Sequence, residues 1–600
     1  MQLLRAGDRV AALATAKELA RDAPDVADAH QLLGVCCAEM ADAKATISAF
    51  ERALTLAPEQ PVILFNYAAA QRKLGAEASA LACLQRAVAA APGYSNAWIE
   101  LGQSALRLDQ AALALLALTR ALELQPDSAT AWHAYGSAQR ANNRLESAEA
   151  AFRRSLELSP KAATTWVNLG AVLRLRGRAD QAIECFETAQ RLGLAGAELG
   201  DALAGAWLDV GDPAQSLARA REVVRGFPAF VPAQVTLAHL LWEYGGGLAP
   251  AEDALAAFRA AVAAQPAHLE MRLALAQFLL AAQQLDEALH HIRILRRHAE
   301  HPSHLRMEAN ALHALGQTDA AAELFAALDR QLTDRDPTFL NDYVRHLLTT
   351  GRIETAAARA LEATRIDPEN QTSWAYLSTA WRLLDDPREH WLCDYDHLIA
   401  LLPVEPPAGL ADQAAFLDAL RQSIEPLHLA AREPVQQSLR GGSQTPGRLF
   451  GRDSVVLAAT QQSLLQTVND WLHTLVRDRN HPFRGRITAG VQICGSWSVK
   501  LWTSGKHVNH IHPQGWMSSA FYLALPPSVT APINGDSQPG FIQFGQPPSE
   551  LGLGLPPRRV ICPEVGKLAL FPSYMWHGTV PFSDQQPRIS IAFDMTPEQP

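Results

Sequence analysis

Three histidines and one arginine near the C-terminal end of this chain have residue types and spacing that could bind a metal ion. His510 and His512 are two residues apart, so in an extended strand their imidazoles project from the same face. His577 follows another apolar segment, 67 residues after His510, a separation that suits two strands meeting across a barrel. Nitrogen ligands with coordination positions left open suit Fe(II).

A candidate anion anchor follows the last of these histidines. Arg588 lies 11 residues after His577, in the alternating segment RISIAF. Ser590, two residues further on, shares its face of the expected strand. Because a guanidinium fork beside a hydroxyl is suited to binding a carboxylate, the pair is predicted to hold the distal carboxylate of a dicarboxylate.

The segments around these residues predict strands. From about residue 486 the chain contains the short apolar alternations ITAGVQI, SWSVKLW, SSAFYLAL, GFIQFG, KLALFP and RISIAF. Glycine and proline turns bound them, which indicates an antiparallel sandwich or barrel. Flanking helices are expected around 413–425 and over 455–476. The segment LRGGSQTPG (439–447) has the composition of a turn and is expected to form a tight turn or a lid over the site.

The pattern H-x-(third ligand)…H…R-x-S resembles the Fe(II)/2-oxoglutarate-dependent oxygenase superfamily over about residues 435–595. HIHPQGWMSSAFYLALP and FPSYMWHGTVPF are similar to a bacterial H-x-H-P branch of it. The resemblance implies a double-stranded β-helix (jelly-roll) domain that uses Fe(II), 2-oxoglutarate and O₂. It also implies that His510 and His577 bind iron and that Arg588 and Ser590 bind 2-oxoglutarate.

The third iron ligand departs from the superfamily. Its usual Asp or Glu, two residues after the first histidine, is replaced by His512. Three alternatives remain open: His512 is itself the third ligand of a three-histidine site; water takes that place, as in the aspartate/asparagine β-hydroxylases; or His507 or another residue fills it. We expect His510, His512 and His577 to be the ligands, and Tyr522 to be the aromatic residue that reaches the co-substrate.

A repeat array occupies the first two thirds of the chain. A fixed period of 34 residues indicates stacked helical hairpins and resembles the tetratricopeptide repeat. Within one unit, Gly136 is expected to let the second helix approach the first, and Pro160 to end the second helix. The residues in phase are Pro24, Pro58, Pro92, Pro126 and Pro160, Trp98, Trp132 and Trp166, and Gly102, Gly136 and Gly170.

The predicted fold class is a multidomain chain in which an all-α tetratricopeptide-repeat solenoid precedes a jelly-roll domain with flanking helices. We expect a superhelix of about ten repeats over 1–390, the later ones irregular, then a linker and helical transition over 391–435. An oxygenase-like β-sandwich domain is expected over 436–600. Gly7 occupies the repeat position of Gly75, so the first repeat is expected either to be truncated or to start upstream.

Composition limits the partners. The formal net charge is -10, which argues against nucleic acid, and no apolar run reaches the roughly 18 residues that span a bilayer. The seven cysteines are scattered without a C-x-x-C, as expected of a cytoplasmic protein.

Together these features predict an Fe(II)- and 2-oxoglutarate-dependent hydroxylase whose substrate is a protein or peptide held in the groove of the repeats. Two alternatives remain open. One is a three-histidine iron dioxygenase that does not use 2-oxoglutarate, and the other is a non-catalytic repeat scaffold for protein–protein interaction.

Overall fold

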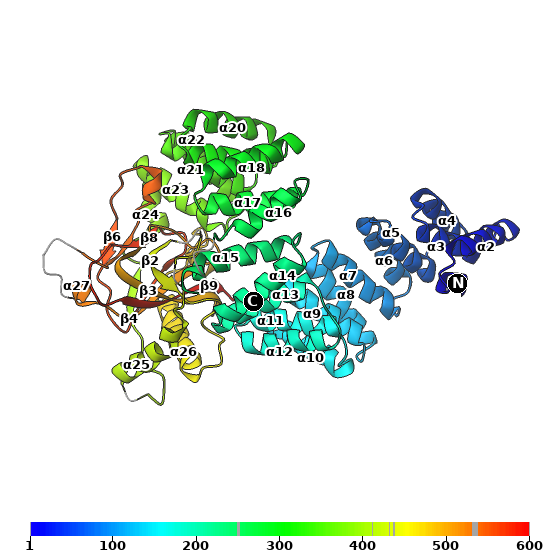
Figure 1. Ribbon diagram of the computed structural model, residues 1–600, viewed down its shortest axis with the longest axis horizontal. Helices are drawn as coiled ribbons and strands as arrows, with labels where there is room; N and C mark the ends of the chain where they lie inside the picture. Colours follow the sequence, from blue (N-terminus) through cyan, green and yellow to red (C-terminus); the bar gives the residue numbers. More distant parts are fainter. Residues whose placement is uncertain are drawn as a thin grey trace. The chain divides into compact units, whose positions relative to one another are not determined.

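The computed structural model describes residues 2–248, 253–410, 412–430, 432–435, 438–530 and 538–598. The chain divides into two compact units, shown in Figure 1. The first contains residues 1–176 and 181–195, and the second contains residues 177–180 and 196–600.

The first unit consists of antiparallel helical hairpins, as the 34-residue period predicts. Each hairpin pairs a first helix with the next helix along the chain, and successive hairpins stack on one another. The helices are α1 (Gln2–Arg5), α2 (Arg9–Asp22), α3 (Ala27–Glu39), α4 (Ala43–Leu56), α5 (Pro61–Lys73), α6 (Glu77–Ala90), α7 (Ser95–Arg107), α8 (Ala111–Leu124), α9 (Ala129–Ala141), α10 (Leu145–Leu158), α11 (Ala163–Leu175) and α12 (Ala179–Arg191).

The repeated glycines allow the two helices of a hairpin to approach closely. A Cβ atom added to Gly136 in α9 would lie 2.8 Å from the ring of Phe152 in α10, and one added to Gly170 would lie 2.6 Å from Phe186. Both distances are too short for a real contact. The role expected for Gly136 is therefore confirmed: a side chain there would displace the aromatic ring that fills the hairpin core.

The repeated tryptophans and prolines are linked by one hydrogen bond. The indole Nε1 of Trp132 donates to the backbone carbonyl of Pro126 at 2.7 Å, six residues earlier. Trp98, Trp166 and Trp374 make the same bond to Pro92, Pro160 and Pro368 at 2.8–2.9 Å. The two residue types keep the same period because each pair ties a first helix to the turn before it.

The second unit continues the helical hairpins and then adds the sheet region. Its helices are α13 (Ala197–Val210), α14 (Pro213–Gly226), α15 (Val231–Leu248), α16 (Ala256–Ala264), α17 (Leu269–Ala281), α18 (Leu285–His298), α19 (Pro302–Ala314), α20 (Thr318–Gln331), α21 (Pro337–Thr349), α22 (Ile353–Ile366), α23 (Gln371–Leu383), α24 (Arg388–Cys393), α25 (Gln413–Ile424), α26 (Val455–Thr474) and α27 (Pro527–Thr530), with short 3₁₀ turns at Glu425–Leu427, Arg484–Arg486 and Ser549–Leu551.

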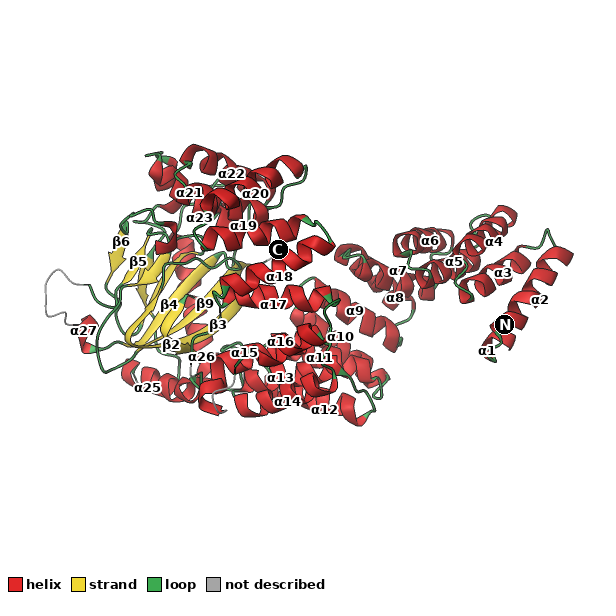
Figure 2. Ribbon diagram, turned by 45° about the horizontal axis from the view of Figure 1, so that its top comes forward, coloured by secondary structure: helices red, strands yellow, loops and turns green. Residues whose placement is uncertain are grey.

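Two antiparallel sheets form the C-terminal part of this unit, as Figure 2 shows. The six-stranded sheet has the order β1-β7-β4-β9-β3-β2, and the three-stranded sheet has the order β6-β5-β8. This arrangement is consistent with the predicted jelly roll. The strands are β1 (Ala400–Pro403), β2 (Leu439–Gln444), β3 (Val491–His507), β4 (Met517–Ala524), β5 (Ile542–Phe544), β6 (Arg559–Ile561), β7 (Lys567–Pro572), β8 (His577–Thr579) and β9 (Arg588–Pro597).

The strand region differs from the sequence analysis in two places. Of the segments ITAGVQI and SWSVKLW, expected as two strands, the last three residues of the first and all of the second belong to one long strand, β3, whose pairing with β9 shifts between Ile493 and Gly495. The segment LRGGSQTPG (439–447), expected as a turn or lid, instead contains the edge strand β2 over its first six residues. Its pairing with β3 shifts between Arg440 and Gly442, and the intervening Gly441 has φ +63°. The glycines therefore form a bulge rather than end the strand.

Helices of the second unit pack directly against the sheets. Phe416 of α25 stacks on Phe521 of β4, with ring centroids 6.1 Å apart. On another side, the indole of Trp576, next to β8, donates to the carbonyl of Ala375 and to the hydroxyl of Thr379, both in α23. The last repeat is thus fixed to the strand that begins at His577.

Among the described residues, no helix has the length and apolarity needed to cross a membrane.

Candidate metal centre

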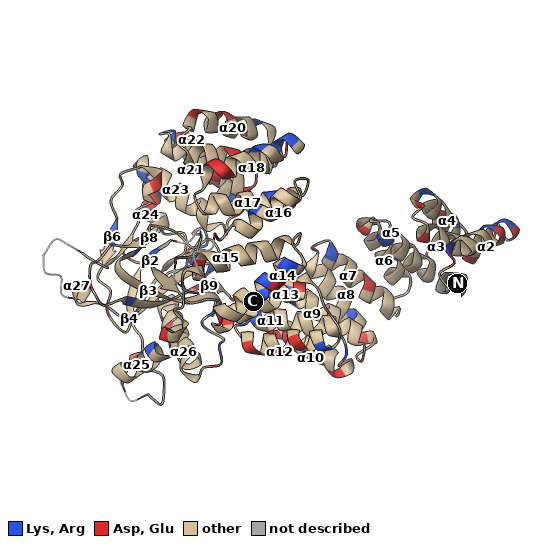
Figure 3. Ribbon diagram, viewed as in Figure 1, with Lys and Arg blue, Asp and Glu red and all other residues tan. Residues whose placement is uncertain are grey.

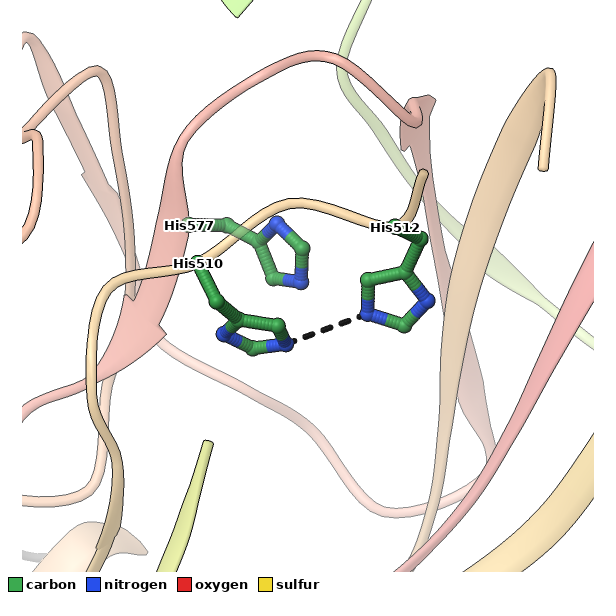
Figure 4. Close-up of side chains that lie close together, drawn as sticks. All are labelled: His510, His512 and His577. Atoms are coloured by element: carbon green, nitrogen blue, oxygen red, sulfur yellow. Dashed lines mark hydrogen bonds between the residues drawn. The ribbon is translucent and has the colours of Figure 1, made fainter. Parts of the chain in front are cut away.

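The three histidines predicted to bind iron lie together, as Figure 4 shows. One ligand nitrogen from each of His510, His512 and His577 lies within 4.8 Å of the other two. Backbone pairing explains the convergence. His510 and His577 form an isolated antiparallel bridge with reciprocal N–H···O bonds of 2.9 and 3.0 Å, and the amide of His512 donates to the carbonyl of Ser573 at 3.1 Å. The loop after β3 is therefore held against β8.

The outer nitrogen of each imidazole has an acceptor. The Nδ1 of His510 lies 2.8 Å from the carbonyl of Val508, and that of His577 lies 3.0 Å from the carbonyl of Met575. The Nδ1 of His512 lies 2.7 and 2.8 Å from the two carboxylate oxygens of Asp594. Because these oxygens only accept, each Nδ1 carries the proton and each Nε2 presents a lone pair.

The Nε2 lone pairs converge without a donor between them. The Nε2 atoms of His510 and His512 are 3.1 Å apart. Two nitrogens bound at right angles to one metal ion at about 2.1 Å lie about 3 Å apart. Two lone pairs facing each other at that distance repel, and a cation between them removes the repulsion. The donor set therefore fits a transition-metal ion with open positions, including Fe(II).

The surroundings of His510 and His577 favour their neutral forms, as metal binding requires. Burial, reinforced by His577 and the neighbouring histidines, holds the pKa of His510 well below its usual value. Burial, followed by the charge of His512, does the same to the pKa of His577.

His507 lies beside the cluster without joining it. Its ring stacks on that of His510 with centroids 5.5 Å apart, and its Nδ1 lies 3.0 Å from the hydroxyl of Ser438. Burial, with the nearby charge of Arg588, lowers the pKa of His507 to about 3. His507 therefore forms an uncharged part of the cavity wall, and it does not belong to the group of His510, His512 and His577 whose nitrogens converge.

Arg588 is a buried cation without a carboxylate partner among the described residues. Its side chain is 3% exposed, and its Nε makes no hydrogen bond. Burial lowers the pKa of the guanidinium. An unpaired buried charge is costly, so this position is suited to an anion brought by a ligand.

The two other predicted co-substrate residues lie near Arg588 and are paired with each other between β4 and β9. Ser590 lines the same cavity, two residues further along β9. Tyr522 of β4 is fully buried, with the guanidinium carbon of Arg588 5.1 Å from its ring centroid, and its hydroxyl has no hydrogen-bond partner. Tyr522 is not among the residues that line the cavity. Its contact with a co-substrate stays a prediction.

A cavity of about 580 Å³ joins the histidines to Arg588. Four residues of β9 at alternate positions face it, namely Arg588, Ser590, Ala592 and Asp594. Away from Arg588 the wall is mainly uncharged, in keeping with the few charged residues on these strands in Figure 3. The neutral wall includes Trp497, Gln444, Gln514 and Cys494.

Asp594 was missed by the sequence analysis, although a signal for it exists. It continues the alternation of Arg588 and Ser590 along β9, which places it on the same face. Its partner, His512, lies 82 residues earlier, so their contact depends on strand register.

Comparisons with known proteins agree with the two parts of the chain. Residues 495–594 match the family described as "Putative 2OG-Fe(II) oxygenase". Residues 99–163, 147–197, 251–304 and 306–371 match the tetratricopeptide repeat family. No curated protein matches the chain.

Solved structures similar to this chain include several repeat proteins. MamA from Desulfovibrio magneticus RS-1 is 20% identical, with 28% of this chain and 94% of that chain covered and a TM-score of 0.27. A tetratricopeptide repeat protein from Parabacteroides merdae is 16% identical, with 37% and 89% covered and a TM-score of 0.32. PilW, a type IV pilus biogenesis factor, is 18% identical, with 35% and 98% covered and a TM-score of 0.33.

The oxygenase family match contains every residue that we predicted for the metal and the co-substrate. The repeat matches cover hairpins from both compact units. The chain therefore contains tetratricopeptide repeats and, in its C-terminal part, a domain that matches the family described as "Putative 2OG-Fe(II) oxygenase".

Proposed function

We propose that this protein is an Fe(II)- and 2-oxoglutarate-dependent hydroxylase that acts on a protein or peptide held by its repeats. The observation that carries the proposal is that one cavity contains both the three converging imidazole nitrogens and the buried, unpaired Arg588. A metal ion would bind the converging Nε2 lone pairs, and the carboxylate of a ligand would pair with the guanidinium of Arg588 in the same cavity.

Each residue has a defined part in this proposal. His510, His512 and His577 hold the iron through Nε2, while the acceptors on Nδ1 fix their rings. Arg588 binds the distal carboxylate of 2-oxoglutarate, and Ser590 donates its hydroxyl to the same group. Tyr522 lies against the guanidinium and orients it.

When bound, iron with 2-oxoglutarate and O₂ supplies the oxidising power that inserts one oxygen atom into a substrate C–H bond, as 2-oxoglutarate yields succinate and CO₂. The protein's own part is to orient the dicarboxylate and to exclude water. Arg588 fixes one end of it from a fully buried position, so its other end is directed along the cavity towards the histidines.

The repeats support a macromolecular substrate. Tetratricopeptide repeats generally mediate protein–protein interaction, and α23 of the last repeat contacts Trp576 next to His577. A segment bound along the repeats would have a scaffold continuous with the catalytic sheets.

The test is 2-oxoglutarate turnover. Purified protein supplied with Fe(II), ascorbate, O₂ and 2-oxoglutarate should release succinate, and Arg588→Ala should need on the order of 100-fold more 2-oxoglutarate for the same rate, because a charge-assisted bidentate contact is lost. A peptide library then identifies the substrate by a mass gain of one oxygen atom. Iron-bound protein that releases no succinate with any peptide would reject the proposal.

The three-histidine dioxygenase remains the second candidate, because the Nε2 of His512 lies 3.1 Å from that of His510. Such an enzyme would oxidise its substrate without consuming 2-oxoglutarate. Oxygen uptake that is independent of 2-oxoglutarate and unchanged by Arg588→Ala would favour it.

A further inference from the structure

Asp594 lies directly behind one of the three converging histidines. Both of its carboxylate oxygens contact the Nδ1 of His512, at 2.7 and 2.8 Å. The residue is 7% exposed, and it pairs in register with Gly495 of β3 and Ser518 of β4. The central strand β9 therefore holds the carboxylate at a fixed depth in the sheet.

Other buried groups hold this carboxylate in place. The hydroxyl of Ser518 donates to Oδ1 of Asp594 at 2.7 Å and lies 2.8 Å from the hydroxyl of Ser573. The backbone carbonyl of Ser573 in turn accepts a hydrogen bond from the backbone N–H of His512. A Cβ added to Gly515 would lie 2.5 Å from the Ser573 hydroxyl and 3.2 Å from Cβ of Asp594, so only glycine fits beside the group.

The charge of this group matters because imidazole ligands bring no negative charge to a metal ion. Asp594 is the sole carboxylate among the described residues that line the cavity. The superfamily pattern places a carboxylate directly on the metal, where this chain has His512. In this structure the carboxylate of Asp594 lies behind the His512 ring and contacts its Nδ1, so the imidazole separates it from the converging nitrogens.

We propose that Asp594 is a positioning residue that orients His512 as a metal ligand. Its carboxylate also supplies, behind His512, the negative charge that a carboxylate ligand would have provided at that position. The hydrogen bond fixes the tautomer of His512 and raises the basicity of its Nε2. The hydrogen bonds of Ser518 and Ser573 hold the Asp594 carboxylate in contact with the His512 ring. This inference rests on the proposed metal site but is separable from it.

The test measures metal affinity directly. Apo-protein is titrated anaerobically with Co(II) against a competing chelator, for the wild type, Asp594→Asn and the control Glu564→Gln. Glu564 is an exposed carboxylate of the same domain, so its variant matches the change in charge. Loss of such outer partners typically costs about 10- to 100-fold in metal affinity. We expect that loss in Asp594→Asn, with a changed Co(II) visible spectrum, and no loss in Glu564→Gln.

A double-mutant cycle separates positioning from a general structural effect. Because Asp594 acts through His512, Asp594→Asn should cause no further loss of affinity in a His512→Ala background. Equal affinity of Asp594→Asn and the wild type would overturn the inference, and so would additive losses. If Asp594→Asn fails to fold, Ser518→Ala decides: weaker binding supports the role and unchanged binding overturns it. No Co(II) binding by the wild type would instead overturn the proposed metal site itself.

Discussion

Hydrogen-bond partners distinguish the predicted metal ligands from the imidazole beside them. His577 is buried and His507 is partly buried, yet only His577 directs Nε2 at the other predicted ligands while its Nδ1 faces a backbone carbonyl. His507 faces the hydroxyl of Ser438 instead. Position in the sequence cannot distinguish the two histidines, but hydrogen-bond partners can.

This difference predicts opposite outcomes for two alanine variants. His577→Ala should lower Fe(II) or Co(II) affinity by more than the roughly 100-fold that an outer partner costs, because a ligand is lost. His507→Ala should keep one metal ion per chain. Metal analysis after anaerobic loading and desalting checks both results. Equal metal loss in the two variants would contradict the assignment of the ligands.

The candidate site residues could be predicted from the sequence because strand alternation and motif spacing are local properties. The prediction placed Arg588 and Ser590 on one face but stopped before Asp594, two alternations further on. It left open whether His512, His507 or water completes the site, because that choice depends on which hydrogen-bond acceptor faces each ring. The acceptors are the backbone carbonyls of Val508 and Met575 and the carboxylate of Asp594, and strand register decides which ring each of them meets.

At the scale of elements, the 34-residue period was readable because each hairpin repeats the same packing. The edge strands were harder to predict. β1 is only four residues long and lies within the segment expected as a linker, and its pairing with β7 joins residues about 170 positions apart. β2 has the glycine content of a turn but is held in the sheet by pairing with β3.

The hairpin packing predicts a glycine effect. Gly136→Ala should destabilise the repeats by about 1–3 kcal/mol, because the new Cβ would overlap the ring of Phe152. Gly93→Ala, where an added Cβ meets nothing within 4 Å, serves as the control. Urea unfolding followed by far-ultraviolet circular dichroism measures both variants. Equal midpoints would mean that the hairpin tolerates a methyl group at Gly136.

The contact between α23 and β8 predicts an effect of Trp576. Trp576→Phe removes the indole N–H and leaves the Ala375 carbonyl and the Thr379 hydroxyl without that donor, which should cost about 1–3 kcal/mol. Trp502 is 41% exposed, so Trp502→Phe is a matched control with little expected effect. Thermal unfolding compares the two. A Trp576 variant as stable as the control would show that this contact adds nothing to stability.

At the scale of the whole molecule, the chain divides at about residue 195, well before the expected end of the repeats at residue 390. Buried contacts explain why the later hairpins belong with the sheets. Tyr574 donates its hydroxyl to the carbonyl of Leu392 at 2.7 Å, and Arg558 pairs with the buried Glu389 at 3.1 Å. Removal of the segment around 371–393 would expose these groups.

Two truncations test this division. A chain of residues 196–600 should fold and bind one metal ion, whereas a chain of residues 391–600 should be insoluble or lack cooperative unfolding, because it loses the partners of Trp576 and Arg558. Circular dichroism melts and metal content report both outcomes. A folded, metal-binding 391–600 fragment would contradict the structural role given to the last repeats.

The central claim is that one cavity binds a metal ion and 2-oxoglutarate together. Its most direct test is an anaerobic titration of the protein with Fe(II) and 2-oxoglutarate, followed by visible absorption. Chelation of the iron by the keto acid should produce a charge-transfer band in the wild type. In Arg588→Ala the band should appear only at much higher 2-oxoglutarate, with iron affinity unchanged. Bound iron without any such band in the wild type would contradict the account.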